Sequence, residues 1–181
     1  MKNFLTATAT AALLAGAAQA DGHAVKIGVV LGFTGPIESL TPHMAASAEM
    51  AMSEVTESGK LLDGMNVEPV RADSTCIDAG AASAAAERLV TSEGVKGIMG
   101  ADCSGVTGAV LSNVAVPNGV VMISPSATSP ALSAAEDNGL FFRTAPSDAR
   151  QGEIMASILM ERGMEEVALT YTNNDYGKGL A

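Results

Sequence analysis

Small hydroxyl side chains stand at two points where helices are expected to begin. Ser104 follows Cys103 directly, and residues 124–129 read Ser-Pro-Ser-Ala-Thr-Ser. The start of a helix has unpaired backbone N–H groups and the positive end of the helix dipole, and both favour an anionic group. The residue types and their positions therefore indicate a cradle for a carboxylate.

A purely local role is also open for the same residues. Ser104 and Ser129 are of the type that caps helices, and Thr128 is of the type found in turns. Their spacing alone does not choose between capping and ligand binding.

The motifs that usually accompany catalysis are missing from the sequence. The chain has two histidines, His23 and His43, and neither has the spacing of a metal ligand. The loop at 32–35 lacks the pattern G-x-G-x-x-G, and neither a P-loop nor a G-x-S-x-G motif occurs. We therefore expect no catalytic residue, no metal and no cofactor, and we expect His43 to face solvent in the first turn of a helix.

Short apolar runs, expected to be strands, alternate with segments of helical periodicity. The expected strands are 25–31, 65–71, 96–101, 120–123, 140–143 and 167–171. The expected helices begin at residues of capping type, namely Thr41, Asp78, Ser104, Ser129 and Ser147 or Asp148. Parallel strands need crossover connections, so the alternation predicts an α/β fold with a doubly wound, mostly parallel sheet and helices on both faces. Ligands of such sheets bind beyond the carboxyl ends of the strands, where both hydroxyl-rich segments fall.

The first twenty residues have the features of a secretion signal. Lys2 precedes an apolar stretch at 4–18, and Ala18-Gln19-Ala20 is a typical cleavage site. We expect a signal peptide over 1–20 and a mature, exported and soluble domain over 21–181. A buried N-terminal helix is the alternative explanation of the apolar stretch.

The charge and composition exclude several partners. Loss of Lys2 with the signal would change the formal net charge from −10 (10 basic minus 20 acidic) to −11 (9 minus 20). An acidic protein without a basic run repels nucleic acid and anionic lipid, so we expect no nucleic-acid partner. A hydrophobic content of 48% with 3% aromatics indicates a globular protein with a core of small and aliphatic residues.

The two cysteines of the chain, Cys76 and Cys103, form an even pair in an exported protein. This context favours a disulfide. Two free buried thiols and a metal site are the alternatives from the sequence.

Several short motifs occur in order along the chain. They are Thr34-Gly35-Pro36, Cys76, Cys103-Ser104, 124–130 (Ser-Pro-Ser-Ala-Thr-Ser-Pro), Phe142-Arg143-Thr144, Gln151-Gly152 and 175–179 (Asp-Tyr-Gly-Lys-Gly). Together they resemble the leucine/isoleucine/valine-type periplasmic binding proteins, the extracytoplasmic receptors of branched-chain amino acid ABC transporters. The resemblance covers essentially all of the mature chain.

The resemblance implies a binding role for the hydroxyl-rich segments. Ser104 matches the serine that binds the carboxylate of the ligand through its hydroxyl and backbone N–H. Ser126 matches the position whose main-chain carbonyl accepts from the ligand ammonium, and Thr128 matches the threonine that contacts both groups. Ala127, between them, is included in the expected ligand-binding set.

The resemblance also implies roles for residues further along the chain. Asp148 matches an acidic residue at the cleft, and Tyr176 matches a tyrosine that closes over the ligand from the hinge side. Cys76 and Cys103 match the disulfide of the family, which braces the loop that carries Ser104. The implied partners are a small-molecule ligand and the membrane permease subunits of a transporter, and the implied location is the periplasm.

Two departures from the family pattern limit what the resemblance implies. Leu40 stands where several members have an aromatic residue near the ligand side chain, so a ligand-sensing domain for an amide, urea or an aromatic acid is the alternative function. Family members have two lobes, and we expect this chain to be the first lobe, truncated and without the second. We expect such a lobe to bind ligand weakly, because half of the pocket is missing.

Overall fold

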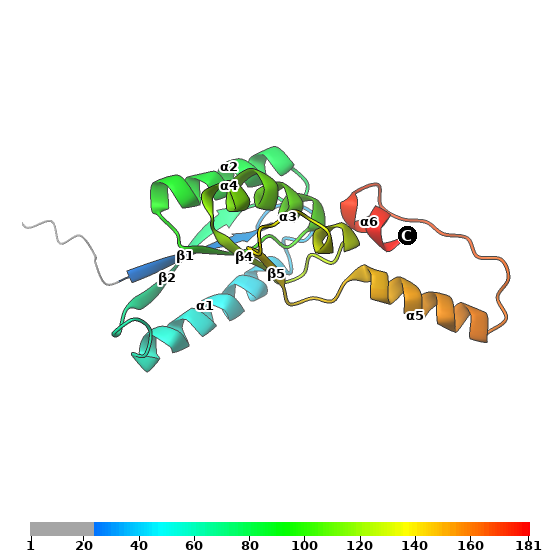
Figure 1. Ribbon diagram of the computed structural model, residues 1–181, viewed down its shortest axis with the longest axis horizontal. Helices are drawn as coiled ribbons and strands as arrows, with labels where there is room; N and C mark the ends of the chain where they lie inside the picture. Colours follow the sequence, from blue (N-terminus) through cyan, green and yellow to red (C-terminus); the bar gives the residue numbers. More distant parts are fainter. Residues whose placement is uncertain (1–23) are drawn as a thin grey trace, which may run out of the picture.

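The computed structural model describes residues 24–181 and shows five parallel strands in one sheet (Figure 1). The spatial order is β2-β1-β3-β4-β5. The strands are β1 (Ala24–Leu31), β2 (Asn66–Asp73), β3 (Gly97–Gly100), β4 (Val121–Ser124) and β5 (Phe141–Arg143). The register pairs Val29 of β1 with Arg71 of β2 and with Met99 of β3. The predicted parallel α/β sheet is confirmed.

Helices lie on both faces of the sheet, as a doubly wound fold requires (Figure 1). One face carries α1 (Thr41–Ser58). The other face carries α2 (Ala79–Arg88), which continues as the π-helical turn η1 (Leu89–Glu93), and α3 (Ser104–Val110) with η2 (Leu111–Ala115) and α4 (Val116–Asn118). The chain then forms the 3₁₀ turn η3 (Pro130–Ser133), α5 (Asp148–Glu161) and α6 (Asp175–Leu180).

The core is divided by the sheet. Successive side chains of a strand point to opposite faces, so Val29 and Leu31 of β1 pack with Ala45 of α1, whereas Val30 packs with α2 and α3. The larger cluster contains Ala82, Ala86, Leu89, Val106, Val110, Val114 and Met122. The buried faces of α2 and α3, with the turns η1 and η2 that continue them, therefore supply most of this cluster.

Helical turns begin at or directly after all five expected starts, but only two of these residues cap a helix with their side chains. The Asp78 carboxylate accepts from the Ala81 N–H at the start of α2, and Ser147 caps α5. Ser104 is the first residue of α3 rather than its cap. Thr41 is the first residue of α1 rather than its cap, because its hydroxyl donates to the carbonyl oxygens of Gly32 and Glu38. Ser129 precedes a 3₁₀ turn of four residues and makes no side-chain cap bond.

The expected strand at 167–171 is wrong for this structure. The segment has no assigned secondary structure, and Val167, Leu169 and Tyr171 are exposed. The outer edge of β5 is unpaired within the described residues, and α5 projects away from the sheet (Figure 1). The apolar alternation typical of a strand is present, but the segment lies where no neighbouring strand pairs with it.

Part of the α1-side face of the sheet is left open. Val121, Ile123 and Phe142 of β4 and β5 are exposed, and α5 exposes Ile154, Met155, Ile158 and Met160. An apolar groove of about 430 Å³ follows this face, lined by Met44, Ser47, Ala48, Met99, Ile123, Pro125 and Thr144.

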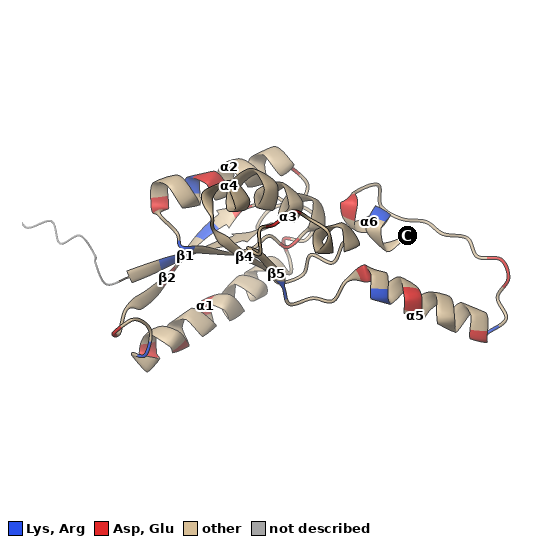
Figure 2. Ribbon diagram, viewed as in Figure 1, with Lys and Arg blue, Asp and Glu red and all other residues tan. Residues whose placement is uncertain are grey.

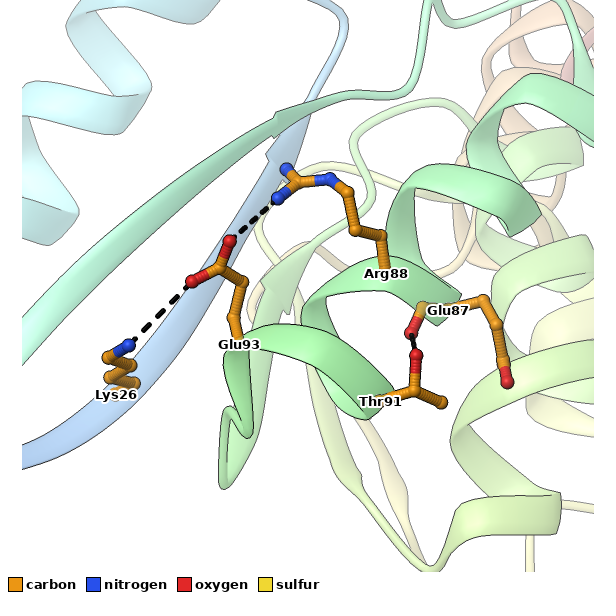
Figure 3. A network of polar contacts seen from close by, with 5 residues as sticks. All are labelled: Lys26, Glu87, Arg88, Thr91 and Glu93. Atoms are coloured by element: carbon orange, nitrogen blue, oxygen red, sulfur yellow. Dashed lines mark hydrogen bonds and ion pairs between the residues drawn. The ribbon is translucent and has the colours of Figure 1, made fainter.

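Charged residues are spread over the lobe rather than gathered on one element (Figure 2). Glu93, at the end of η1, pairs with Arg88 at 2.9 Å and with Lys26 of β1 at 3.6 Å (Figure 3). These pairs are partly exposed to solvent and connect the turn after α2 to the first strand, with a small contribution to stability. His43 is exposed in the first turn of α1, as expected.

Candidate ligand-binding site

The two hydroxyl-rich segments meet at the carboxyl edge of β3 and β4. Ser104 is the first residue of α3 and is 4% exposed. Its Oγ atom accepts a hydrogen bond of 3.1 Å from the backbone N–H of Ser129. Cys103, not Ser104, occupies the N-cap position, so the Ser104 hydroxyl joins two loops instead of capping its own helix.

The loop after β4 is held by its own serines. The Ser124 hydroxyl donates to the carbonyl of Ala101 at 2.5 Å and accepts from the N–H of Ala127 at 3.0 Å. The Ser126 hydroxyl donates to the main-chain oxygen of Asp102 at 2.9 Å. Ala127 is buried and Ser126 is exposed. The centre of the turn is therefore packed against the protein, and the neighbouring residue 126 is accessible to solvent.

Thr128 contacts Asp148 through side chain and backbone. The Thr128 hydroxyl donates to Asp148 Oδ2 at 2.7 Å, and the N–H of Asp148 donates to the carbonyl of Thr128 at 3.0 Å. Asp148 is the first residue of α5 and is 4% exposed. A groove of about 250 Å³ borders the pair, lined by Thr128, Pro146, Ser147, Asp148, Arg150, Gln151, Ile154 and Met155.

Tyr176 is not hydrogen-bonded to the other candidate residues. It lies in α6 and is 45% exposed, and its side chain makes no hydrogen bond to another residue within 24–181. The helix itself packs against α3 and η3. A Cβ atom added to Gly105, the second residue of α3, would lie 3.3 Å from Asp175 Oδ2, so the start of α6 is beside the start of α3.

Arg143 is a site-adjacent residue to which the sequence pointed only as part of a family motif. Its guanidinium donates to the carbonyls of Ala127 and Ser129, at 3.3 and 2.9 Å, and to the hydroxyl of Ser133. The sequence signal that could have identified Arg143 is its position at the end of the expected strand 140–143, beside the loop that follows β4. Arg143 fixes the carbonyl groups of the hydroxyl-rich turn.

Thr34 and Asp73 join the loops that follow β1 and β2. The hydroxyl and N–H of Thr34 donate to the Asp73 carboxylate at 2.5 and 3.3 Å, and the N–H of Thr75 donates at 2.8 Å. Burial alone raises the pKa of Asp73, but these bonds, together with one from the Phe33 N–H, outweigh it and hold the pKa below its ordinary value.

Cys76 and Cys103 form the predicted disulfide, with a Cα–Cα distance of 5.2 Å. The bridge connects the loop after β2 to the residue before Ser104. Both alternatives, free thiols and a metal site at these cysteines, are therefore wrong. Asp102, which precedes the bridge, is buried and was not singled out by the sequence.

The sheet and its helices match one lobe of a type I periplasmic binding protein. Residues 24–181 match the family described as periplasmic binding protein, and the chain belongs to that family. The predicted family is confirmed, and a family of binding proteins agrees with the expectation that the chain is not an enzyme.

The chain is similar in sequence and structure to proteins that bind branched-chain amino acids. It is 34% identical over 170 residues to Leu/Ile/Val-binding protein homolog 3 of Brucella melitensis, covering 92% of this chain and 44% of that protein. A branched-chain amino acid transporter substrate-binding protein from Streptococcus pneumoniae, in complex with isoleucine, is similar with a TM-score of 0.75 and 30% identity, over 87% of this chain and 44% of that one.

A third similarity is to an ABC transporter substrate-binding protein of Desulfitobacterium hafniense in complex with Leu. The TM-score is 0.71 at 30% identity, over 87% of this chain and 44% of that one. The chain thus spans less than half the length of the relatives it matches.

Two further features bear on the sequence expectations. The signal peptide expected over 1–20 lies outside the described residues. Over residues 24–181, the structure contains no helix with the length and apolar character needed to cross a membrane.

Proposed function

We propose that the chain is the first lobe, over residues 21–181, of an exported substrate-binding protein that serves an ABC transporter and binds a branched-chain or related amino acid. The observation that carries the proposal is the meeting of Ser104, the hydroxyl-rich turn and the Thr128–Asp148 pair at one edge of a sheet in a chain of this family. Ligands of doubly wound sheets bind at this edge.

The carboxylate of the amino acid is assigned to Ser104. The hydroxyl of Ser104 and the first N–H groups of α3 offer donors, and the helix dipole favours a negative charge there. Ser104 is bridged to the next loop by the Ser129 N–H, which fixes the hydroxyl oxygen in place.

The ammonium group is assigned to the opposite side of the turn. The main-chain carbonyl of Ser126, the hydroxyl of Thr128 and the carboxylate of Asp148 are acceptors of the kind that an ammonium group requires. Thr128 already donates to Asp148, so its oxygen lone pairs are free to accept from the ligand. Ala127 shapes the floor of the turn, and Tyr176 covers the site from α6.

Closure by a second lobe follows from the same proposal. The chain spans 44% of its relatives, which leaves room in them for another lobe of similar size. Hinge closure of two lobes around a ligand is a common mechanism of binding proteins, and the closed complex would deliver its ligand to membrane permease subunits. The periplasm is the proposed location.

A thermal-shift panel on the full-length protein tests the ligand class. A ligand that binds only the folded state raises the midpoint of unfolding, so leucine and valine should raise it more than glutamate does. Leucine should give no low-micromolar affinity with the lobe of residues 21–181 alone. A shift with amides, urea or aromatic acids and with no amino acid would replace the amino-acid assignment by the sensing alternative.

A further inference from the structure

Asp102 is a buried carboxylate whose contacts reach the ends of four strands. It is 3% exposed and lies two residues after the end of β3. Its Oδ2 atom accepts from the N–H of Gly32, just after β1, at 2.7 Å. Its Oδ1 atom accepts from the N–H of Cys103 at 2.9 Å and from the hydroxyl of Ser74, just after β2, at 3.3 Å.

The backbone of Asp102 completes the connection. Its main-chain oxygen accepts from the hydroxyl of Ser126, in the loop after β4, at 2.9 Å. One residue thus ties together the segments that follow β1, β2, β3 and β4, which are the segments at the ligand-binding edge.

The packing around Asp102 is close enough to make the position of its carboxylate specific. A Cβ atom added to Gly32 would lie 3.2 Å from Cys76 Cβ and 3.3 Å from Asp102 Oδ2. The carboxylate and the disulfide therefore meet at the same junction, and a glycine is what lets the chain after β1 pass between them.

Asp102 is bound by neutral donors rather than by a cation. None of the ion pairs among residues 24–181 includes it. Burial of a carboxylate is costly unless hydrogen bonds satisfy its oxygens, so the three donors must be held at fixed positions around it. An arrangement of this kind specifies geometry more than it adds stability.

We propose that Asp102 is a positioning residue of the ligand-binding site: its carboxylate holds the residue before Ser104 against the segments that follow β1 and β2, and its main-chain oxygen holds the Ser126 loop to the same point. Asp102 acts through its neighbours, and no contact with the ligand is assigned to it. The ligand-dependent part of this inference rests on the proposed function, whereas the loop-fixing part does not.

The test compares Asp102→Asn with Asp78→Asn in the full-length protein. An asparagine at 102 replaces one acceptor oxygen by an NH₂ donor, so at least one of the three donors loses its partner. Asp78 also accepts from a backbone N–H, and asparagine caps a helix equally well, which makes the second variant a matched control.

Two readouts separate positioning from general stability. Calorimetry with L-leucine should show an affinity about tenfold weaker or more for Asp102→Asn and unchanged for Asp78→Asn. In Asp102→Asn, hydrogen exchange should be about tenfold faster than in the wild type at the amides of Ser129 and Ala127, which donate to the hydroxyls of Ser104 and Ser124. Exchange of the amides of β1 should change little.

The outcomes are distinct. The proposal would be overturned if folded Asp102→Asn bound leucine as tightly as the wild type does. It would also be overturned if the hydrogen exchange of the Ser129 amide were unchanged, or if exchange were accelerated equally throughout β1. If wild-type protein binds no leucine, the proposed function fails and the exchange result alone decides the role of Asp102. If Asp102→Asn does not fold, Ser74→Ala, which removes one donor, should show smaller changes of the same kind, and no change would overturn the proposal.

Discussion

The hydroxyl of Thr128 donates a hydrogen bond of 2.7 Å to the Oδ2 atom of Asp148. The two residues are 20 positions apart and belong to different segments, the turn after β4 and the start of α5. The bond places a nearly buried carboxylate beside the turn that is proposed to hold the ligand.

Thr128→Val tests the importance of this bond to the fold. The substitution keeps the shape of the side chain and leaves Asp148 without its hydroxyl donor, which should lower the free energy of unfolding by about 1–3 kcal/mol. Urea unfolding measures the change. Thr91→Val is the control, because Thr91 donates to a backbone carbonyl on an exposed helix surface, and its effect should stay within about 0.5 kcal/mol. Equal effects of the two variants would contradict the prediction.

Removal of the disulfide should destabilise the lobe. Cys76 and Cys103 are separated by 27 positions, and closing a loop of that size stabilises a protein by about 3 kcal/mol in the chain-entropy treatment. The double variant Cys76→Ala/Cys103→Ala should unfold at a lower urea concentration than the oxidised wild type. A reducing agent should lower the midpoint of the wild type and leave that of the variant unchanged. An unchanged wild-type midpoint after confirmed reduction would refute the prediction.

Stability should fall in acid through two carboxyl groups. The hydrogen bond from Arg71 lowers the pKa of Glu49 and outweighs its burial, and the bonds to Asp73 lower the pKa of that carboxyl despite burial. A group whose pKa is lower in the folded state stabilises the protein above the unfolded value, and that stability is lost as the pH falls through the folded value.

The pH range follows from the ordinary values of 4.5 for Glu and 3.8 for Asp. The urea midpoint of unfolding should be constant near neutral pH and should decrease when the pH is lowered below these pKa values. The decrease should be shallower in Asp73→Asn. Thr34→Val, which keeps the carboxyl and removes a donor, should be intermediate. A fall in Asp73→Asn as steep as in the wild type would show that Asp73 is not a source of the acid sensitivity.

The apolar surface of α5 should promote self-association of the lobe alone. Ile154, Met155 and Ile158 are exposed, and contiguous apolar surface of this kind favours association. Ile158→Glu should reduce concentration-dependent association measured by sedimentation velocity. Ser157→Glu, on the neighbouring position of the same helix, is the matched control and should not. Similar sedimentation of both variants and the wild type would contradict this prediction.

Most of the central fold could be predicted because local and tertiary preferences agree there. The second half of the run at 25–31, residues 28–31, is buried on both faces of the sheet, and Asp78 caps its helix as its type suggests. The alternation of strands with helices then determines a parallel sheet. The segment 167–171 has the composition of a strand, but a strand also needs a neighbour, and the sequence pattern does not show whether one is available.

The sequence predicted which residue types form the candidate site, but it did not predict the residues that hold the loops of the site in place. Ser104 and Thr128 attract notice as hydroxyl residues near expected helix starts. Asp102 and Arg143 act on carbonyl and N–H groups from several loops at once, and these contacts exist only after the sheet brings the loops together. A single sequence contains no periodicity that marks such residues.

Calorimetric titration of the full-length protein with L-leucine, in wild type and in Ser104→Ala, tests the central claim most directly. The proposed site predicts measurable binding by the wild type and a loss of about 10- to 100-fold in Ser104→Ala, because a hydrogen bond to a charged group is removed. Ser112→Ala, which removes an exposed hydroxyl further along the same helical segment, should bind as the wild type does. Equal leucine affinity in Ser104→Ala and wild type would contradict the assignment of the ligand carboxylate to Ser104.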